Sequence, residues 1–288
     1  MVKKVGVLSL AYCGGCEVAL LSVGDMLEKI INGDISLEYC TIAVDNVEIP
    51  EVDVMLVTGA VRSQRDEELV KIAREKAKVL VPFGSCACYG GIPGLLNLEN
   101  IENVLEEVFK KKTLASGGRA PTRLLHEAKP VGAVVDVDYI VPGCPPPQGL
   151  ISTLATAILQ NKPVRLPDTN VCTDCPRKRS EKIISVKPRQ RIRSLSDLDP
   201  DKCLLEQGVL CLGSITVGGC NALCLKKGAW CSGCMGPLPG KSFDEEFIDL
   251  VSSVFSNASV EELRRAIPDL LKIAYMFVSP RSKEGERK

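Results

Sequence analysis

The fold of this chain is decided by its first segment, which reads KVGVLSLAYCGGCEVALLSVGDMLEKII from residue 4 to residue 31. The apolar run at 4–10 predicts a buried strand, and the helical spacing of apolar residues at 17–31 predicts a helix. A loop with two cysteines lies between them. The segment therefore predicts the first strand-loop-helix unit of an α/β fold.

The same alternation continues through the first half of the chain. Short apolar runs predict further strands at 35–43, 52–58, 78–83 and 138–141. Periodic segments between them predict helices at 64–76, 99–111 and 148–160. Strands that alternate with helices in this way predict a parallel, doubly wound sheet.

The composition describes a globular chain without net charge. Of its 288 residues, 45% are hydrophobic, and 36 basic residues balance 36 acidic ones. No overall field therefore attracts nucleic acid or an anionic membrane. No run of about 18 apolar residues predicts a membrane span, and the start shows no export signal, so we expect a cytoplasmic protein.

The pattern changes after Lys162, where prolines become frequent and periodicity is lost. Eight of the fourteen cysteines fall between residues 172 and 234. We therefore predict two domains, with the sheet in 1–162 and a loop-rich, cysteine-rich domain in 163–288. Because such a segment buries little apolar area, a bound inorganic core would replace part of a hydrophobic one.

Two helices are predicted near the end of the chain, at 243–256 and 260–276. Ser259 with Glu262 three residues later forms a capping-box pattern before the second helix. Pro268 should kink that helix, because proline removes a backbone donor.

Fourteen cysteines stand against a single histidine, His126, to which we assign no role. A disulfide framework is typical of short secreted chains and does not fit a long chain without an export signal. Metal binding by thiolates is the better interpretation, and iron–sulfur clusters use four cysteines each. Structural zinc sites, which also favour Cys-x2-Cys pairs, stay open as an alternative.

Four cysteines of the first domain are expected to meet. Each follows a predicted strand, and the carboxyl ends of parallel strands form one crevice in an open sheet. A Cys-x-x-Cys pair alone would also suit a redox dithiol or half a zinc site, but the two partners elsewhere disfavour both interpretations. The four residues are Cys13, Cys16, Cys86 and Cys144.

Three motifs of this domain resemble the small subunit of nickel–iron hydrogenases. They are CGGCE at 13–17, GSCACYGG at 84–91 and PGCPP at 142–146. The resemblance implies a flavodoxin-like domain in which the four cysteines hold a proximal 4Fe-4S cluster, against a partner large subunit with the nickel–iron centre. The complex I subunit that carries its last cluster shares this domain, so the second half of the chain must separate the two families.

The second half of the chain resembles the medial and distal cluster region of the hydrogenase small subunits, through Cys211-Leu-Gly-Ser-Ile-Thr and the Cys231 to Cys234 pair. By that resemblance, both further clusters are of the 4Fe-4S type. The distal ligands would be Cys172, Cys175, Cys203 and Cys211. The medial ligands would be Cys220, Cys224, Cys231 and Cys234.

Two cysteines exceed the twelve ligands of this scheme. Cys40 and Cys88 are interpreted as small buried hydrophobes, although Cys88 lies close enough to Cys86 for a ligand exchange. Glu17 is explained by the helix macrodipole, and the resemblance also suggests a place in a proton path. The basic run at 178–193 lacks interleaved aromatic residues and is interpreted as a solvated or docking face.

The resemblance implies an electron-transfer subunit of a cytoplasmic, hetero-oligomeric hydrogenase, similar to the methyl-viologen-reducing, F420-nonreducing archaeal type. Such a subunit would relay electrons from H2 oxidation through three 4Fe-4S clusters to an iron–sulfur adaptor, and on to heterodisulfide reductase in methanogenesis. The alternatives are a sulfhydrogenase delta-type subunit, a complex I-like oxidoreductase subunit and a zinc-stabilised binding module.

Overall fold

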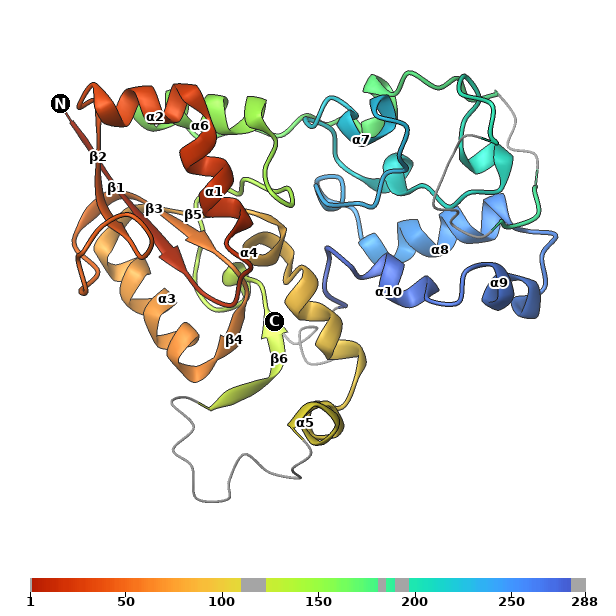
Figure 1. Ribbon diagram of the computed structural model, residues 1–288, viewed down its shortest axis with the longest axis horizontal. Coiled ribbons are helices and arrows are strands. Elements are labelled where there is room, and N and C mark those ends of the chain that lie inside the picture. The colour runs from red at the N-terminus through yellow and green to blue at the C-terminus, as the bar shows by residue number, and fades with distance from the viewer. Residues whose placement is uncertain (1, 110–122, 181–184, 190–196, 281–288) are drawn as a thin grey trace. The chain divides into compact units, whose positions relative to one another are not determined.

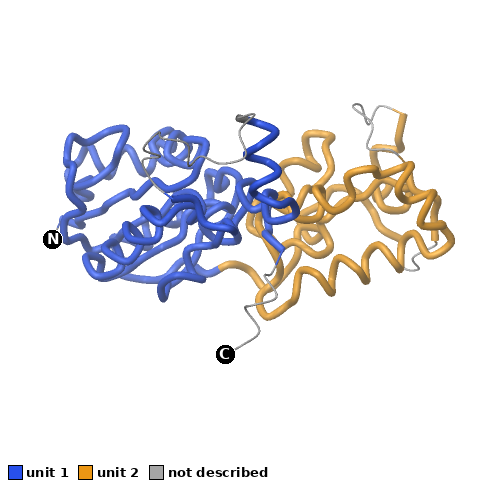
Figure 2. Tube along the Cα trace, turned by 90° about the horizontal axis from the view of Figure 1, so that it is seen from below, with its two compact units in different colours: residues 1–165, 277–288 blue, residues 166–276 orange. Residues whose placement is uncertain are grey.

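The computed structural model describes residues 2–109, 123–180, 185–189 and 197–280. The chain forms two compact units, shown in two colours in Figure 2. Unit 1 contains Met1–Arg165 and the chain from Phe277 onward, and unit 2 contains Leu166–Met276. Within the described residues, no helix is long and apolar enough to cross a membrane.

Unit 1 is built on a parallel sheet of four strands in the order β2-β1-β3-β5. The strands are β1 (Lys3–Ser9), β2 (Ile35–Cys40), β3 (Val52–Thr58) and β5 (Ala77–Pro82). Their runs of aliphatic residues are buried, as expected for a sheet covered on both faces. This is the strand order of a flavodoxin-like fold without its last strand, so the predicted α/β class is confirmed.

Helices cover both faces of this sheet. In Figure 1, α1 (Gly15–Ser22), α2 (Gly24–Ile31) and α6 (Gln148–Gln160) lie above the strands, and α3 (Gln64–Lys76) lies below them. A capping box at Ser63 and Asp66 fixes the start of α3. The core between the layers includes Leu8, Met55 and Leu80, each with at most 1% of its surface exposed.

A small accessory region completes unit 1. A two-stranded antiparallel sheet pairs β4 (Val61–Ser63) with β6 (Leu124–Lys129). The helical elements α4 (Ser85–Tyr89), the 3₁₀ helix η1 (Ile92–Leu98), α5 (Ile101–Phe109) and η2 (Val131–Ala133) complete this part of the chain. His126 lies on β6 with its side chain exposed.

In the described part of unit 2, the elements before residue 243 are short and helical. They are the 3₁₀ helices η3 (Val171–Asp174), η4 (Leu205–Gln207) and η5 (Leu212–Ile215), and α7 (Leu223–Lys226). Three helices follow, α8 (Phe243–Val254), α9 (Val260–Ala266) and α10 (Leu270–Ala274). The predicted loop-rich character of this region is what the structure shows.

Three predicted elements differ from the observed ones. The helix predicted at 17–31 is two helices, because Val23 adopts an extended conformation between them. The helix predicted at 260–276 ends at Ala266, two residues before Pro268, instead of kinking there. The strand predicted at 138–141 is reduced to one parallel bridge between Phe83 and Val141.

The division of the chain also differs in one respect from the predicted ranges. The units part after Arg165, close to the predicted boundary at 162. The segment from Phe277, however, belongs to unit 1, because Val278 pairs with Gly90 and Ser279 hydrogen-bonds to Tyr89. This segment therefore belongs to unit 1, although it follows unit 2 in the sequence.

Candidate metal centres

Three cysteine-bearing segments meet at the carboxyl edge of the sheet in unit 1. Cys13 and Cys16 follow β1, Cys86 lies on α4 just after β5, and Cys144 follows the bridge at Val141. Burial, followed by the nearby charges of Cys86, Cys144 and Cys13 in that order, raises the pKa of the Cys16 thiol to about 12. The predicted first set therefore converges.

The backbone at this edge approaches the thiols closely at two glycines. A Cβ on Gly84, which has a φ of +92°, would overlap the Sγ of Cys16. A Cβ on Gly91 would stand 2.7 Å from the Sγ of Cys86. Burial raises the pKa of Cys86, and a hydrogen bond from the backbone N–H of Ile92 lowers it in part. Four thiols with backbone donors beside them are the donor set that a 4Fe-4S cluster requires.

Glu17 is fully buried beside this set, in the first turn of α1. Its carboxylate accepts a hydrogen bond from the hydroxyl of Ser9, and that hydroxyl lies 3.1 Å from the hydroxyl of Thr41. Among the described residues, its second oxygen has no hydrogen-bond partner. The helix dipole alone therefore does not account for Glu17, because a dipole does not require burial of the carboxylate.

A second group of four thiols gathers in unit 2. Cys172 and Cys175 belong to the turn of η3, and Cys203 and Cys211 precede η4 and η5. Burial, followed by the charges of Cys211, Cys175 and Cys203, raises the pKa of Cys172 to about 12. The residues that the resemblance assigned to the distal cluster thus lie together.

The last four cysteines form two pairs, of which the first is Cys220 and Cys224. Burial, followed by the charge of Cys220, raises the pKa of Cys224. Between them, Asn221 and Ala222 adopt left-handed conformations with φ of 53° and 47°, which turn the chain tightly.

The other pair, Cys231 and Cys234, adjoins the second group. Burial raises the pKa of Cys231, and Cys211 contributes more to this rise than Cys234 does. The backbone N–H of Cys231 also donates to the Sγ of Cys211 at 3.4 Å. The pair of Cys231 and Cys234 is therefore a neighbour of the second group, and the division of ligands between a medial and a distal set stays a prediction.

Of the two remaining cysteines, Cys40 is buried and Cys88 is half-buried. Cys40 is 1% exposed, and the thiol of Cys88 donates to the carbonyl of Pro82 at 3.4 Å. Burial raises the pKa of Cys88, which keeps it protonated. In the described residues, no three Cys, His, Asp or Glu side chains are arranged to share one metal ion. A cluster does not need that spacing, because each thiolate binds a different iron.

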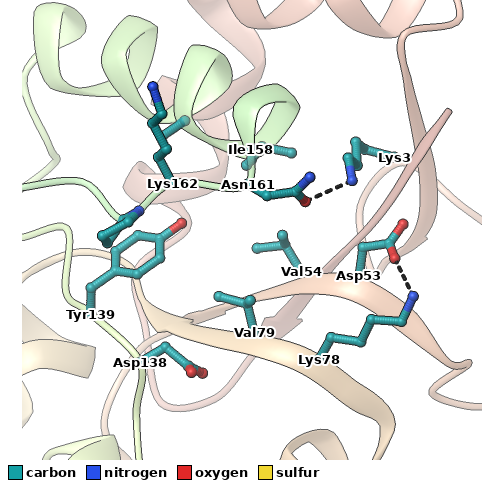
Figure 3. Close-up of a pocket in the computed structure, with 12 residues that line it drawn as sticks. Lys3, Asp53, Val54, Lys78, Val79, Asp138, Tyr139, Ile158, Asn161 and Lys162 are labelled. Carbon is teal, nitrogen blue, oxygen red and sulfur yellow. Dashed lines mark hydrogen bonds and ion pairs between the residues drawn. The ribbon is translucent and has the colours of Figure 1, made fainter. Parts of the chain in front are cut away.

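A cavity of about 410 Å³ lies at the opposite, amino-terminal edge of the sheet (Figure 3). Two of its polar contacts are already made, because Lys78 contacts Asp53 at 2.8 Å and Lys3 donates to Asn161 at 2.7 Å. None of the thiols of the first set lines this cavity, because they lie at the other edge of the sheet.

Comparisons with known proteins identify the family of the chain. Residues 13–158 match the family described as NADH ubiquinone oxidoreductase, 20 Kd subunit. The chain is 36% identical to a subunit of the F420-non-reducing hydrogenase vhu of Methanocaldococcus jannaschii, over 96% of this chain and 95% of that protein. It is 32% identical to the sulfhydrogenase 2 subunit delta of Pyrococcus furiosus, over 81% and 86% of the two chains.

A solved structure gives the same answer for the fold. An NAD+-reducing [NiFe]-hydrogenase in the H2-reduced state contains a chain that is 29% identical, with a TM-score of 0.52, over 58% of this chain and 96% of that one. The family match and the similar relatives thus agree with the solved structure. The chain therefore belongs to the small subunits of nickel–iron hydrogenases, and within them to the F420-non-reducing type.

Proposed function

We propose that this chain is the electron-transfer subunit of a cytoplasmic nickel–iron hydrogenase that oxidises H2. The observation that carries the proposal is the convergence of Cys13, Cys16, Cys86 and Cys144 at one edge of the sheet. Two of these, Cys13 and Cys144, are exposed, so a partner large subunit with the nickel–iron centre can approach them. The chain itself carries no site for splitting hydrogen in this proposal.

The proposal assigns twelve cysteines to three 4Fe-4S clusters, which supply one-electron transfer when bound. The first set would hold the proximal cluster, and the residues around Cys172 would hold the distal one. The medial cluster would be held by Cys220, Cys224, Cys231 and Cys234. Support for a medial position comes from the contact of Cys231 with Cys211 of the distal set. Glu17 stays a candidate for a proton path beside the first set.

For the acceptor, we propose an iron–sulfur adaptor subunit leading to heterodisulfide reductase. Support comes from the similarity to the hydrogenase subunit of Methanocaldococcus jannaschii, a relative named as F420-non-reducing. A sulfhydrogenase delta-type subunit is the second candidate for the function of this chain itself. The relative of that type has a lower identity over a smaller share of the chain.

A complex I-like role is less well supported. The match to the 20 Kd subunit family ends at residue 158, before the eight cysteines of unit 2 begin at Cys172. Several thiols of unit 2 are buried and grouped, which a complex I-like function would leave without a purpose.

The test is to purify the chain with its large partner and measure metal and acid-labile sulfide. About twelve irons and twelve sulfides per chain would support the proposal, because three 4Fe-4S clusters contain that number. About four of each would favour the complex I type, and zinc in place of iron would refute both.

Two variants locate the clusters. Cys86→Ala should lose about four irons, whereas the matched control Cys88→Ala should lose none. The two thiols are two residues apart, and the thiol of Cys88 is bonded to the carbonyl of Pro82. Equal losses in both variants would contradict the assignment of the first set.

A further inference from the structure

The chain returns to unit 1 after Met276 and contacts the helix that carries Cys86. Val278 forms an antiparallel bridge with Gly90, and the N–H of Ser279 donates to the carbonyl of Tyr89 at 2.7 Å. Tyr89 is the last residue of α4. We call residues 278–279 the C-terminal strap, which is thus bonded to the end of the helix that carries a candidate ligand.

The side chain of Asn97 joins the strap to two other segments. Its amide nitrogen donates to the hydroxyl of Ser279 at 2.8 Å and to the carbonyl of Ala128 at 2.9 Å. Its amide oxygen accepts from the N–H of Ala128 at 2.8 Å. All three bonds are of normal length, so η1, β6 and the strap are fastened at one point.

The segment between the strap and Cys86, which includes the start of η1, is tightly packed at its three glycines. A Cβ on Gly90 or Gly94 would stand 2.6 or 2.8 Å from the Cβ of Ser279. A Cβ on Gly91 would stand 2.6 Å from the Cα of Cys86. The loop at 90–94 therefore lies in direct contact with Ser279 on one side and Cys86 on the other, and a displacement of either is transmitted to it.

This loop also supplies a donor to the ligand. The backbone N–H of Ile92 hydrogen-bonds to the thiol of Cys86. In an iron–sulfur site, hydrogen bonds to the sulfurs stabilise the more negative, reduced cluster and raise its reduction potential. The position of the loop therefore controls a property of the cluster and not only its retention.

We propose that Ser279, held by Asn97, is a positioning residue that keeps the loop at 90–94 against Cys86 and thereby sets the potential of the proximal cluster. The inference rests on the proposed function, because it requires a cluster bound by Cys86. Ser279 itself touches no ligand and acts only through the loop. A segment that follows all of unit 2 in the sequence is therefore part of the first metal site.

The experiment uses the purified complex of this chain with its large subunit. The clusters are followed by redox-poised EPR, and the proximal signal is first identified as the one lost in Cys16→Ser. Ser279→Ala removes the hydroxyl but leaves the backbone bridge, so the cluster should be retained with a lower midpoint potential. The other two clusters should keep theirs.

Further variants separate positioning from general stability. Asn97→Ala should produce at least the same shift, because it also removes the two bonds to Ala128. Adding Ser279→Ala to Asn97→Ala should shift the potential no further, because the two side chains share one hydrogen bond. Ser259→Ala is the matched control, since it removes the side-chain cap of α9 in unit 2, and it should leave the proximal potential unchanged.

Three outcomes decide the matter. A lower potential confined to the proximal cluster in Ser279→Ala supports the strap. An unchanged potential, or an equal shift in all three clusters, contradicts the positioning role of Ser279 but not the proposed function. If the EPR signals of Cys16→Ser are the same as those of the unmodified complex, no cluster depends on Cys16. That result contradicts both the proposed role of Ser279 and the proposed function.

Discussion

The candidate ligands of unit 1 lie at the edge of its hydrophobic core, whereas several candidate ligands of unit 2 are part of the interior. In unit 1, Cys13 and Cys144 are exposed, while Met55 and Leu80 in the sheet are fully buried. In unit 2, Cys211 and Cys231 are themselves buried, and the elements around them are short. The sheet therefore positions its candidate ligands from outside its core, whereas unit 2 includes some of its candidate ligands in its interior.

Iron removal should produce the largest difference in stability between the two units. Without iron, unit 2 should lose most of its hydrogen-exchange protection around η3 and η5, because the buried thiols lose the clusters that join them. The strands of unit 1 should keep their protection, since their core contains no ligand. Hydrogen exchange followed by mass spectrometry on the iron-free chain measures both, and equal loss in the two units would refute the comparison.

Leu80→Ala tests the opposite dependence. Leu80 is completely buried in β5, so its truncation should destabilise unit 1 by about 2–5 kcal/mol. Hydrogen exchange in β1 and β3 would show the loss. Hydrogen exchange in η3 and η5 of the iron-loaded protein should not change. A loss of protection there as well would mean that the stabilities of the two units are coupled.

Gly84→Ala tests how closely the sheet edge is fitted to its thiols. An alanine at the φ of +92° and ψ of 156° of Gly84 costs about 1–3 kcal/mol in backbone strain, and its Cβ would also overlap the Sγ of Cys16. We expect loss of about four irons from the first site. Gly33→Ala is the control, because its φ is +76° but nothing lies within 4 Å of the added Cβ. It should retain all the iron.

The smallest expected effect is a pH dependence in α9. The hydrogen bond from the backbone N–H of Ser259 lowers the pKa of Glu262 from its ordinary 4.5, and Lys187 lowers it further. A lowered pKa in the folded state means that the stabilisation is present above pH 4.5 and is lost as the pH falls through the lowered value. The protection factors of the amides at the start of α9 should therefore fall in acid, whereas those of Glu262→Gln should not change with pH through this group.

The first site could be predicted from the sequence because its position follows from a topological rule. Once β1, β3 and β5 are parallel neighbours, the segments after them meet, whatever separates them in the chain. The predicted strand at 138–141 was wrong, yet Cys144 was placed correctly, because one bridge at Val141 suffices to bring it to the edge.

Other features could not be predicted, because they depend on tertiary contacts without a periodic signal. Nothing in the sequence around Ser279 distinguishes it, and its role rests on bonds to Tyr89 and Asn97, which lie more than 180 residues away. The break at Val23 is similar, since the apolar spacing continues through it. In unit 2, spacing suggested the ligand groups, but only the folded chain shows that Cys231 adjoins Cys211.

The strap gives the biosynthesis of this protein a fixed order. Unit 2 is inserted into the sequence of unit 1, so the ribosome releases Ser279 only after every candidate ligand has been made. Domains fold as they emerge, and unit 2 can therefore fold while the first candidate site still lacks the strap. A chain interrupted between Met276 and Ser279 would contain all fourteen cysteines and still leave the ribosome with an unfinished first site.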